Sequence, residues 1–558
     1  ILYNDAVAMT GGQQVGERPE GHSVLQIAQS MQAEGVARVV IVTDEPEKYD
    51  NVKIAGDPLV KHRDLLDSIQ REFREIKGTT AIIYDQTCAT EKRRRRKRGT
   101  AVDPAKRVII NELVCEGCGD CNVQSNCLSV EPLETEFGRK RAVNQSSCNK
   151  DMSCLKGFCP SFVTVEGGQL KKAKKSKRQL TAEMIGRLPE PQLPELSDAK
   201  VWEGLVAGVG GTGVITIGQL VGMAARLDGK GIVTQDAAGL AQKGGSTWSH
   251  ILIAGQQETI KTTRVGEAAA DLVLACDAVV AAANDTIVCM GKGRTHVALN
   301  HQSAPTAAFL SDNNWHNSQD DCGRLISEIV GDDHVGGFNA AAAASGLMGD
   351  AIYGNLMLLG FAWQQGWLPI SQAAMLRAIE LNAVAVESNK DAFNWGRMAA
   401  ALPTEFNQAL QPSHVIRFTP KETLDSLVNQ RVKFLSAYQN KRYAERYRQF
   451  VSQVQQREEA LLGKDTLSKS VARNLFKLMA YKDEYEVARL HSDPAFMGRI
   501  TEQFEGDFTV NFHLAPPLLA KRNTEGQLLK SKFGQRTLIA FRMLARMKGL
   551  RGTWFDIF

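Results

Sequence analysis

The chain has 558 residues and a mass of 61.1 kDa. This length predicts several domains, because single hydrophobic cores stop growing at about 250–300 residues. The hydrophobic content of 43% is ordinary for a globular protein. No run of about 18 apolar residues occurs, which argues against a membrane span, and no signal peptide is visible.

The first hundred residues alternate strand and helix patterns. Short β-rich runs at 39–42 and 81–84 are typical of buried parallel strands, and helical periodicity covers 25–33 and 65–76. The chain starts at Ile1 without a Met, on an apolar stretch that is typical of a strand interior. We therefore expect the end of a parallel α/β domain, in a fragment of a longer polypeptide.

A dense group of cysteines follows. Seven of the eleven cysteines lie in residues 115–159, and the segment opens Cys115-x2-Cys118-x2-Cys121 and closes on Cys159-Pro160. Three thiolates at this spacing with a distant Cys before Pro are typical of a 4Fe–4S ligand set. A zinc site normally draws paired ligands from two knuckles, and a disulfide framework belongs to small secreted domains. We expect one cluster on Cys115, Cys118, Cys121 and Cys159, and a reducing cytoplasmic location.

Three further cysteines of the segment are harder to place. Cys127 precedes Leu128 rather than Pro, and the second run reads Cys148-x5-Cys154-x4-Cys159. A two-cluster ferredoxin needs eight ligands, and only seven thiols are present. A second, altered cluster on Cys127, Cys148 and Cys154 would need a ligand from elsewhere. The alternative is a degenerate site whose thiols are merely buried.

Two basic runs border the cysteine segment. Residues 92–98 are seven consecutive Lys and Arg, and residues 171–178 add a second run, although the net charge is only +5. The plain interpretation is two solvated loops. A positive collar that steers an acidic electron carrier is the first alternative. Nucleic-acid binding has the least support, because neither run is interleaved with aromatic residues.

A second α/β domain begins at Val201. The turn Gly208-x-Gly210-Gly211-x-Gly213 lies between a predicted strand and a helix that runs to Ala225, and it either approaches an anion or permits tight strand–helix packing. Asp236 follows at a spacing that allows a nicotinamide site. Further strands are predicted at 232–234, 248–254, 272–275 and 297–299, helices at 339–398, charged helices at 441–459 and a strand at 508–512.

The N-terminal edge carries a third motif. Asn4 and a nearby carbonyl offer hard oxygen ligands that suit Mg²⁺ holding a diphosphate, and the turn Thr10-Gly11-Gly12-Gln13 can aim amides at the same anion. Alone, this segment is more typical of an ordinary loop.

In chain order these segments resemble the 2-oxoacid:ferredoxin oxidoreductases, and within them the fused indolepyruvate ferredoxin oxidoreductases. The resemblance implies that Asn4 and the carbonyl of Ala6 bind Mg²⁺ and that residues 10–13 contact thiamine diphosphate. Met9 falls where pyruvate-using relatives carry an Asn, which favours a bulkier, apolar 2-oxoacid. The loop Leu240-Ala-Gln-Lys-Gly-Gly245 matches the indolepyruvate branch and argues against NAD.

The implied architecture is a multidomain α/β protein. It comprises the end of a thiamine-diphosphate domain (1–100), a ferredoxin-like module (101–168), a linker (169–198), a gamma-type domain (199–400) and a mostly helical extension (401–558). The implied activity is oxidative decarboxylation of an arylpyruvate with CoA, with electrons passing from thiamine diphosphate through the cluster to ferredoxin, in a homodimer. The alternative is a non-catalytic iron–sulfur electron-transfer subunit with a nucleotide-binding domain.

Overall fold

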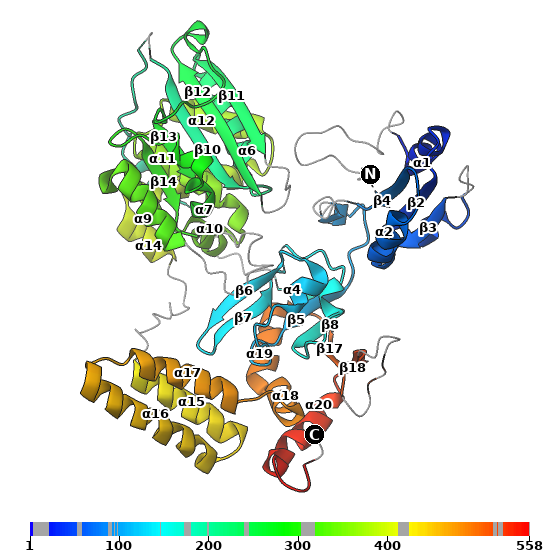
Figure 1. The fold of residues 1–558 in the computed structure, drawn as a ribbon. Coiled ribbons are helices and arrows are strands. Elements are labelled where there is room, and N and C mark those ends of the chain that lie inside the picture. Colours follow the sequence, from blue (N-terminus) through cyan, green and yellow to red (C-terminus); the bar gives the residue numbers. More distant parts are fainter. Residues whose placement is uncertain are drawn as a thin grey trace. The chain divides into compact units, whose positions relative to one another are not determined.

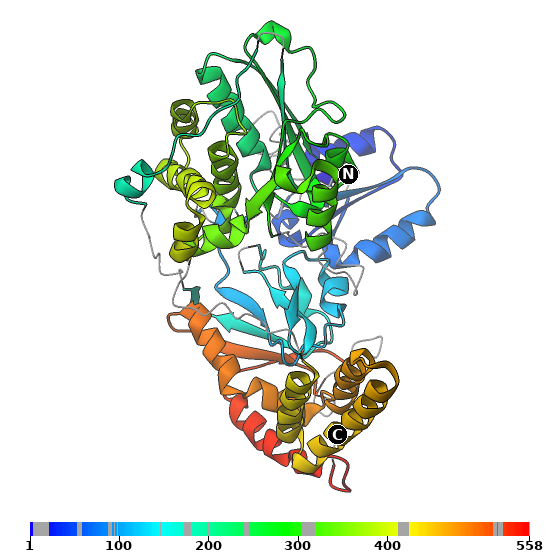
Figure 2. The ribbon, with the colours of Figure 1, turned by 90° about the vertical axis from the view of Figure 1, so that its left-hand side faces the viewer.

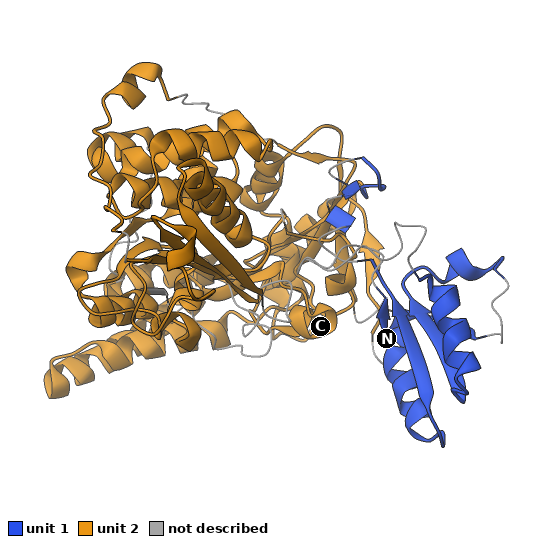
Figure 3. Cartoon of the chain, turned by 90° about the horizontal axis from the view of Figure 1, so that it is seen from above, with its two compact units in different colours: residues 1–104, 238–243 blue, residues 105–237, 244–558 orange. Residues whose placement is uncertain are grey.

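The computed structural model describes residues 1–3, 22–52, 58–87, 92–93, 95–96, 99–145, 147–171, 180–197, 200–238, 245–302, 319–410, 423–516, 520, 522 and 528–556. It has a mixed α/β fold, as predicted, and two compact units (Figure 3). The first unit consists chiefly of Ile1–Pro104, and the second of Ala105–Ala237 and Gly244–Phe558. In the described part of the chain, no helix combines the length and the apolar character needed to cross a membrane.

The first unit is a parallel sheet covered by a helix on each face. Because successive strand residues point to opposite faces, Val39 and Ile41 pack with Val24 of α1, whereas Val40 and Val42 pack with Ile69 of α2. This arrangement confirms the predicted parallel strands. The sheet order is β1-β4-β2-β3, with β1 (Leu2–Tyr3), β2 (Arg38–Thr43), β3 (Leu59–His62) and β4 (Thr80–Asp85), and the helices are α1 (Val24–Ala33) and α2 (Leu66–Arg74).

The cysteine segment shares one sheet with the C-terminal region. Strand β17 (Thr509–Leu514) pairs antiparallel with β8 (Phe162–Glu166), and the sheet order is β18-β17-β8-β5 (Figure 1). The outer strands are β5 (Lys106–Ile110) and β18 (Ser531–Phe533). The segment also contains α4 (Asp120–Ser125) and the hairpin β6 (Val130–Thr135) and β7 (Gly138–Val143). The C-terminal region, predicted as a mostly helical extension, therefore also supplies half of this sheet.

A six-stranded sheet forms the core of residues 202–410. Its order is β11-β12-β10-β13-β14-β15, with β10 (Trp202–Val209), β11 (Gly231–Ala238), β12 (Ser246–Ala254), β13 (Leu272–Ala275), β14 (His296–Asn300) and β15 (Val335–Phe338). One face packs against α6 (Val214–Leu227), α10 (Ala340–Met348), α11 (Gly354–Gln364), α12 (Gln372–Leu381) and α13 (Val386–Ala401), as Figures 1 and 2 show. The other face packs against α7 (Ala278–Ala281) and α9 (Gln319–Val330). Helix α14 (Pro403–Leu410) packs at the edge of the core that α6 and α10–α13 form with the sheet.

The C-terminal helices form a bundle and a cover for the shared sheet. The bundle consists of α15 (Leu424–Tyr438), α16 (Lys441–Leu462) and α17 (Thr466–Met479) around a core of its own. The cover consists of α18 (Glu484–His491), α19 (Pro494–Gln503) and α20 (Thr537–Arg546), whose apolar residues pack on Val163 and Val165 of β8. The predicted helix at 441–459 and strand at 508–512 are thus confirmed.

Candidate iron–sulfur site

Glycines allow the first three predicted ligands to lie on one tight loop. Gly117 and Gly119 have φ values of 67° and 82°, a region that side chains disfavour. A Cβ on Gly117 would lie 2.3 Å from the carbonyl oxygen of Arg139 in β7, so the loop passes directly against the hairpin. The amide of Gly117 donates a hydrogen bond to the Cys115 sulfur at 3.3 Å. Amide donors of this kind stabilise a thiolate more than a neutral thiol.

Asp120 holds the distant fourth cysteine near this loop. Its Oδ2 accepts a hydrogen bond from the amide of Phe158 at 3.2 Å, and Phe158 immediately precedes Cys159. A Cβ on Gly157 would lie 2.3 Å from the same oxygen, so glycine is needed for this approach. Asp120 is therefore a positioning residue that the spacing of the cysteines does not reveal.

The four ligands predicted for the first cluster lie within electrostatic reach of one another. Burial raises the pKa of Cys115 to about 11, and the charge of Cys159 adds to that rise. Burial also raises the pKa of Cys121 to about 12, with further contributions from Cys115, Cys159 and Cys118. The structure thus brings Cys115, Cys118, Cys121 and Cys159 together as one group, which we call the first thiol group.

The three remaining cysteines form a second thiol group, Cys127, Cys148 and Cys154. Burial raises the pKa of Cys154, and Cys148 and Cys127 raise it further. Cys154 also interacts with Cys121, so the two groups are neighbours. The carboxylate of Asp151 raises the pKa of both Cys148 and Cys154 and is an oxygen donor beside this group. Asp151 was not predicted from the sequence, although it lies three residues before Cys154.

The donor set of this site consists mainly of cysteine thiols. None of the ten cysteines in the described residues is in a disulfide. Within the described ranges, no three Cys, His, Asp or Glu side chains converge as the ligands of one ion do. Five of the thiols contact one apolar core, namely Cys115, Cys121, Cys127, Cys154 and Cys159.

Buried cations balance the negative charge of this site. Lys140 and Arg141 in β7 are only 7% and 2% exposed. Lys140 lowers the pKa of Cys115 and Arg141 lowers that of Cys121, opposing the effect of burial. Lys530, from the C-terminal region, does the same for Cys159. Cations close to a cluster favour its more negative, reduced state.

His491 of α18 ties the C-terminal region to both ends of the first thiol group. Its Nε2 lies 2.9 Å from the carbonyl oxygen of Pro160, so Nε2 carries the proton and donates. Its Nδ1 then accepts a hydrogen bond from Asn111 Nδ2 at 3.3 Å. Pro160 follows Cys159, and Asn111 lies four positions before Cys115. One imidazole therefore binds both the chain segment that leads to Cys115 and the segment that leaves Cys159.

This histidine makes the stability of the fold depend on pH. Burial lowers the pKa of His491 to about 4, against an unfolded value of about 6.5. The unfolded chain therefore binds more protons between these values, and stability present above pH 6.5 is lost as the pH falls towards 4. At pH 5.5 we expect a loss of about 1 kcal/mol from His491 alone.

Thermal unfolding of the wild type and of His491→Gln, measured from pH 7.5 to 4.5, checks this prediction. The variant should be less stable at neutral pH and should show a shallower fall on the acid side. His62→Gln, at an exposed position, is the matched control and should keep the wild-type slope. An unchanged slope in His491→Gln would contradict the assignment.

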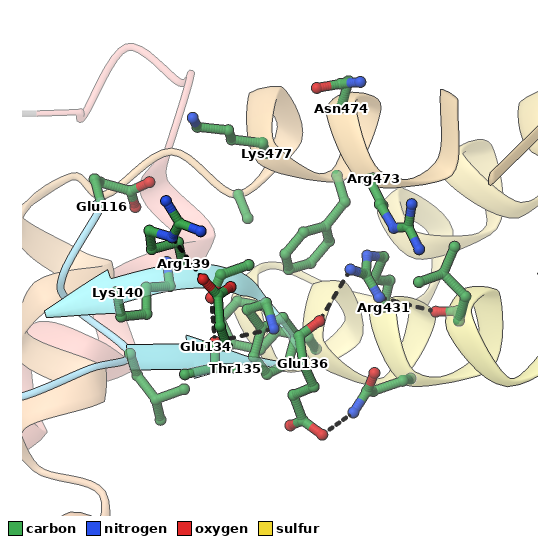
Figure 4. A pocket seen from close by; sticks show the side chains of 18 of the residues that line it. Glu116, Glu134, Thr135, Glu136, Arg139, Lys140, Arg431, Arg473, Asn474 and Lys477 are labelled. Carbon is green, nitrogen blue, oxygen red and sulfur yellow. Dashed lines mark hydrogen bonds and ion pairs between the residues drawn. The ribbon is translucent and has the colours of Figure 1, made fainter. Parts of the chain in front are cut away.

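A pocket of about 830 Å³ lies beside the first thiol group, between the β6–β7 hairpin and helices α15 and α17 (Figure 4). Glu116, which follows Cys115, lines it and pairs with Lys482 at 3.8 Å. Arg473 and Lys477 of α17 also line it, and three packed phenylalanines form its apolar part: Phe137, Phe434 and Phe476. Glu134 and Glu136 also line it, but Lys and Arg outnumber the carboxylates of the lining. An apolar floor with an excess of cations suits a partly acidic partner.

Several other residues that were predicted to form sites lie outside the described part of the chain. Asn4, Ala6, Met9 and residues 10–13 lie outside the described residues, so their assignment to thiamine diphosphate and Mg²⁺ stays a prediction. Residues 94, 97 and 98 of the first basic run, residues 172–178 of the second and residues 240–244 of the Leu240–Gly245 loop also lie outside the described residues.

The glycine turn between β10 and α6 is explained by packing. A Cβ on Gly208 would lie 2.7 Å from Val214 Cγ2, and one on Gly218 would lie 2.0 Å from Ser249 Oγ. The Gly210 amide donates to the carbonyl oxygen of Gly245 at 2.8 Å and is not available to an anion. Of the two interpretations left open for this turn, close strand–helix packing is the one supported by these contacts.

The domain that carries this turn matches a known family. Residues 203–399 match the model described as pyruvate ferredoxin/flavodoxin oxidoreductase. The match supports 2-oxoacid:ferredoxin oxidoreduction as the general chemistry of the chain. Residues 424–558 match a family of unknown function, DUF6537. Comparison with curated proteins gives no match.

Three solved structures are similar to parts of this chain. The gamma subunit of a keto/oxoacid ferredoxin oxidoreductase from Geobacter sulfurreducens is 21% identical, covers 36% of this chain and 98% of its own, and has a TM-score of 0.26. Subunit PORC of a pyruvate oxidoreductase from Thermotoga maritima is 17% identical, with 36% and 96% covered and a TM-score of 0.26. A 2-oxoglutarate:ferredoxin oxidoreductase from Magnetococcus marinus is 16% identical, with 43% and 37% covered and a TM-score of 0.28.

Proposed function

We propose that the protein oxidatively decarboxylates an arylpyruvate with CoA and passes the electrons through an iron–sulfur centre to a ferredoxin. In balance, one 2-oxoacid, one CoA and two oxidised ferredoxins give one acyl-CoA, one CO2, two reduced ferredoxins and one proton. The observation that carries the proposal is the first thiol group, Cys115, Cys118, Cys121 and Cys159, in the same chain as the oxidoreductase domain at 203–399.

Each group of residues has a distinct part in this proposal. The first thiol group would hold a 4Fe–4S cluster, which supplies one-electron steps that a zinc site does not. Thiamine diphosphate, held with Mg²⁺ by Asn4, Ala6 and residues 10–13, would serve as the electron sink for decarboxylation. The second thiol group adjoins the first through Cys154 and Cys121, and a second cluster there would extend the electron path.

The chain's own side chains would set the properties of the cluster site. Burial of Cys115 and Cys121 excludes water from the sulfurs, and the Gly117 amide and the cations Lys140 and Arg141 offset the negative charge. Burial and hydrogen bonding to the sulfurs are what tune the potential of such a centre. The pocket that Glu116 lines, next to Cys115 in the chain, would receive the acidic carrier.

The substrate class is tested by steady-state reduction of a viologen dye. The full-length protein is assayed anaerobically with thiamine diphosphate, Mg²⁺ and CoA, and with indolepyruvate, phenylpyruvate, pyruvate or 2-oxoglutarate. The proposal expects kcat/KM for the arylpyruvates to exceed that for pyruvate by at least about 100-fold, because a Met at position 9 removes a polar partner and adds apolar contact. Met9→Asn should reduce the ratio of kcat/KM for the arylpyruvates to kcat/KM for pyruvate. A preference for pyruvate or 2-oxoglutarate would contradict the arylpyruvate assignment while leaving the general chemistry intact.

A non-catalytic electron-transfer subunit is the second candidate. It would use the first thiol group and would need no thiamine site. A protein that accepts electrons from dithionite but from no 2-oxoacid, with all cofactors present, would support this alternative.

A further inference from the structure

The C-terminal region of unknown function is physically part of the cysteine module. Strand β17 pairs with β8 over four residues, from Thr509 opposite Glu166 to Phe512 opposite Val163. His491 binds the carbonyl of Pro160, and His513 Nε2 lies 3.0 Å from Thr164 Oγ1. All of these contacts are made with residues 160–166, the segment that follows Cys159. The region is therefore placed to act on the thiol site itself.

Lys530 is a side chain of this region that lies beside the cysteine segment. Its ammonium donates to the carbonyl oxygen of Leu155 at 3.3 Å and lies 5.1 Å from the centre of the Phe162 ring. Leu155 follows Cys154 of the second thiol group, and Phe162 lies three residues after Cys159 of the first. The ammonium is thus anchored between backbone segments that carry one ligand from each group.

Most of the groups that can place a negative charge near this ammonium are thiols. Burial lowers the pKa of Lys530, and the groups that oppose this are Cys159, Asp120, Cys154 and Cys121. Three of those four are thiols of the site. Burying a cation is costly unless an opposite charge compensates it. A bound cluster with its thiolate ligands supplies that charge, and neutral thiols do not.

We propose that Lys530 sets the reduction potential of the cluster on Cys115, Cys118, Cys121 and Cys159, and that this is a function of the C-terminal region. A fixed positive charge close to the cluster favours the more negative, reduced state and so raises the potential. In this proposal Lys530 holds a positive charge near the cluster and does not itself bind iron. The inference rests on the iron–sulfur assignment of the proposed function, but not on the substrate.

The test compares Lys530→Met with Lys532→Met in the full-length protein. Both variants remove one lysine charge, but the Lys532 side chain is 49% exposed and pairs with Glu166 at 2.7 Å. Iron and sulfide are counted first, and the midpoint potential is then measured by a redox titration followed by EPR. Loss of the Lys530 charge should lower the equilibrium constant for reduction about tenfold, which is about 59 mV for one electron. Lys532→Met should change it by less than about threefold, because water and salt screen an exposed charge.

The outcomes separate this inference from the proposed function. Wild-type protein without iron and sulfide would remove the iron–sulfur assignment itself. A fully loaded Lys530→Met with an unchanged potential, or with a shift no larger than that of Lys532→Met, would overturn only the role of Lys530. If Lys530→Met loses its cluster, the potential is measured on Lys530→Arg, which keeps the positive charge. An Arg variant that holds the cluster at a potential near wild type supports a role for the charge. An Arg variant without a cluster shows that Lys530 has a purely structural role.

Discussion

Serine in place of Cys121 is expected to abolish the EPR signal of the first cluster and to lower bound iron by about four atoms per chain. Cys121 is buried and lies among Cys115, Cys118 and Cys159, so water cannot easily replace its sulfur. A serine hydroxyl stays protonated near neutral pH and is a much weaker ligand than a thiolate. Iron and sulfide analysis of anaerobically purified protein checks the result.

The same measurement on Cys154→Ser decides between one cluster and two. Wild-type protein with about eight irons that falls to about four in Cys154→Ser would establish a second cluster on the second thiol group. Wild-type protein with about four irons that Cys154→Ser retains would identify that group as a degenerate site. Cys322→Ser, on α9 and outside both thiol groups, is the control and should keep the wild-type iron content. Retention of iron in Cys121→Ser would contradict the ligand set.

Alanine in place of Gly396 is expected to destabilise the oxidoreductase domain by about 3 kcal/mol. Helices α11 and α13 cross in backbone contact, and a Cβ on Gly396 would lie 1.8 Å from the carbonyl oxygen of Met357. Gly360 makes the reciprocal approach, 2.0 Å from the carbonyl oxygen of Phe393. Both contacts are with backbone, so the helices must separate for a methyl group to enter.

Gly346→Ala is the matched control for this prediction. Gly346 lies in α10, and the nearest atom to its added Cβ is Leu410 Cδ2 at 3.9 Å. With space available, alanine should stabilise the helix by about 0.5–1 kcal/mol. Calorimetry of the full-length protein should show the domain transition moving down in Gly396→Ala and not in Gly346→Ala. Equal transitions in both variants would contradict the close helix crossing.

Local patterns predicted the positions of many elements and little of how distant elements meet. The β-rich runs at 39–42 and 81–84 became β2 and β4, and the apolar run at 248–254 became β12, because burial on a sheet leaves a local signature. The strand at 508–512 was also visible, but its pairing with β8 was not. Strand pairing depends on both partners, and no single stretch of sequence records it.

The candidate site could likewise be predicted only in part from local sequence patterns. The first four thiols were predicted from spacing alone, since a cluster demands ligands at short, regular intervals. Lys530 and His491 were missed because their chemistry depends on tertiary position: His491 lies 380 residues after its partner Asn111. Asp120 was missed because its role is to hold the backbone before Cys159, which leaves no ligand pattern.

The most direct test of the account is anaerobic EPR of the full-length protein with thiamine diphosphate, Mg²⁺ and CoA, recorded before and after addition of indolepyruvate. The account predicts a reduced 4Fe–4S signal that appears only with the 2-oxoacid. A cluster that dithionite reduces but no 2-oxoacid does would contradict the enzymatic assignment. Protein that contains zinc and no cluster under strict anaerobic conditions would contradict the iron–sulfur assignment of Cys115, Cys118, Cys121 and Cys159.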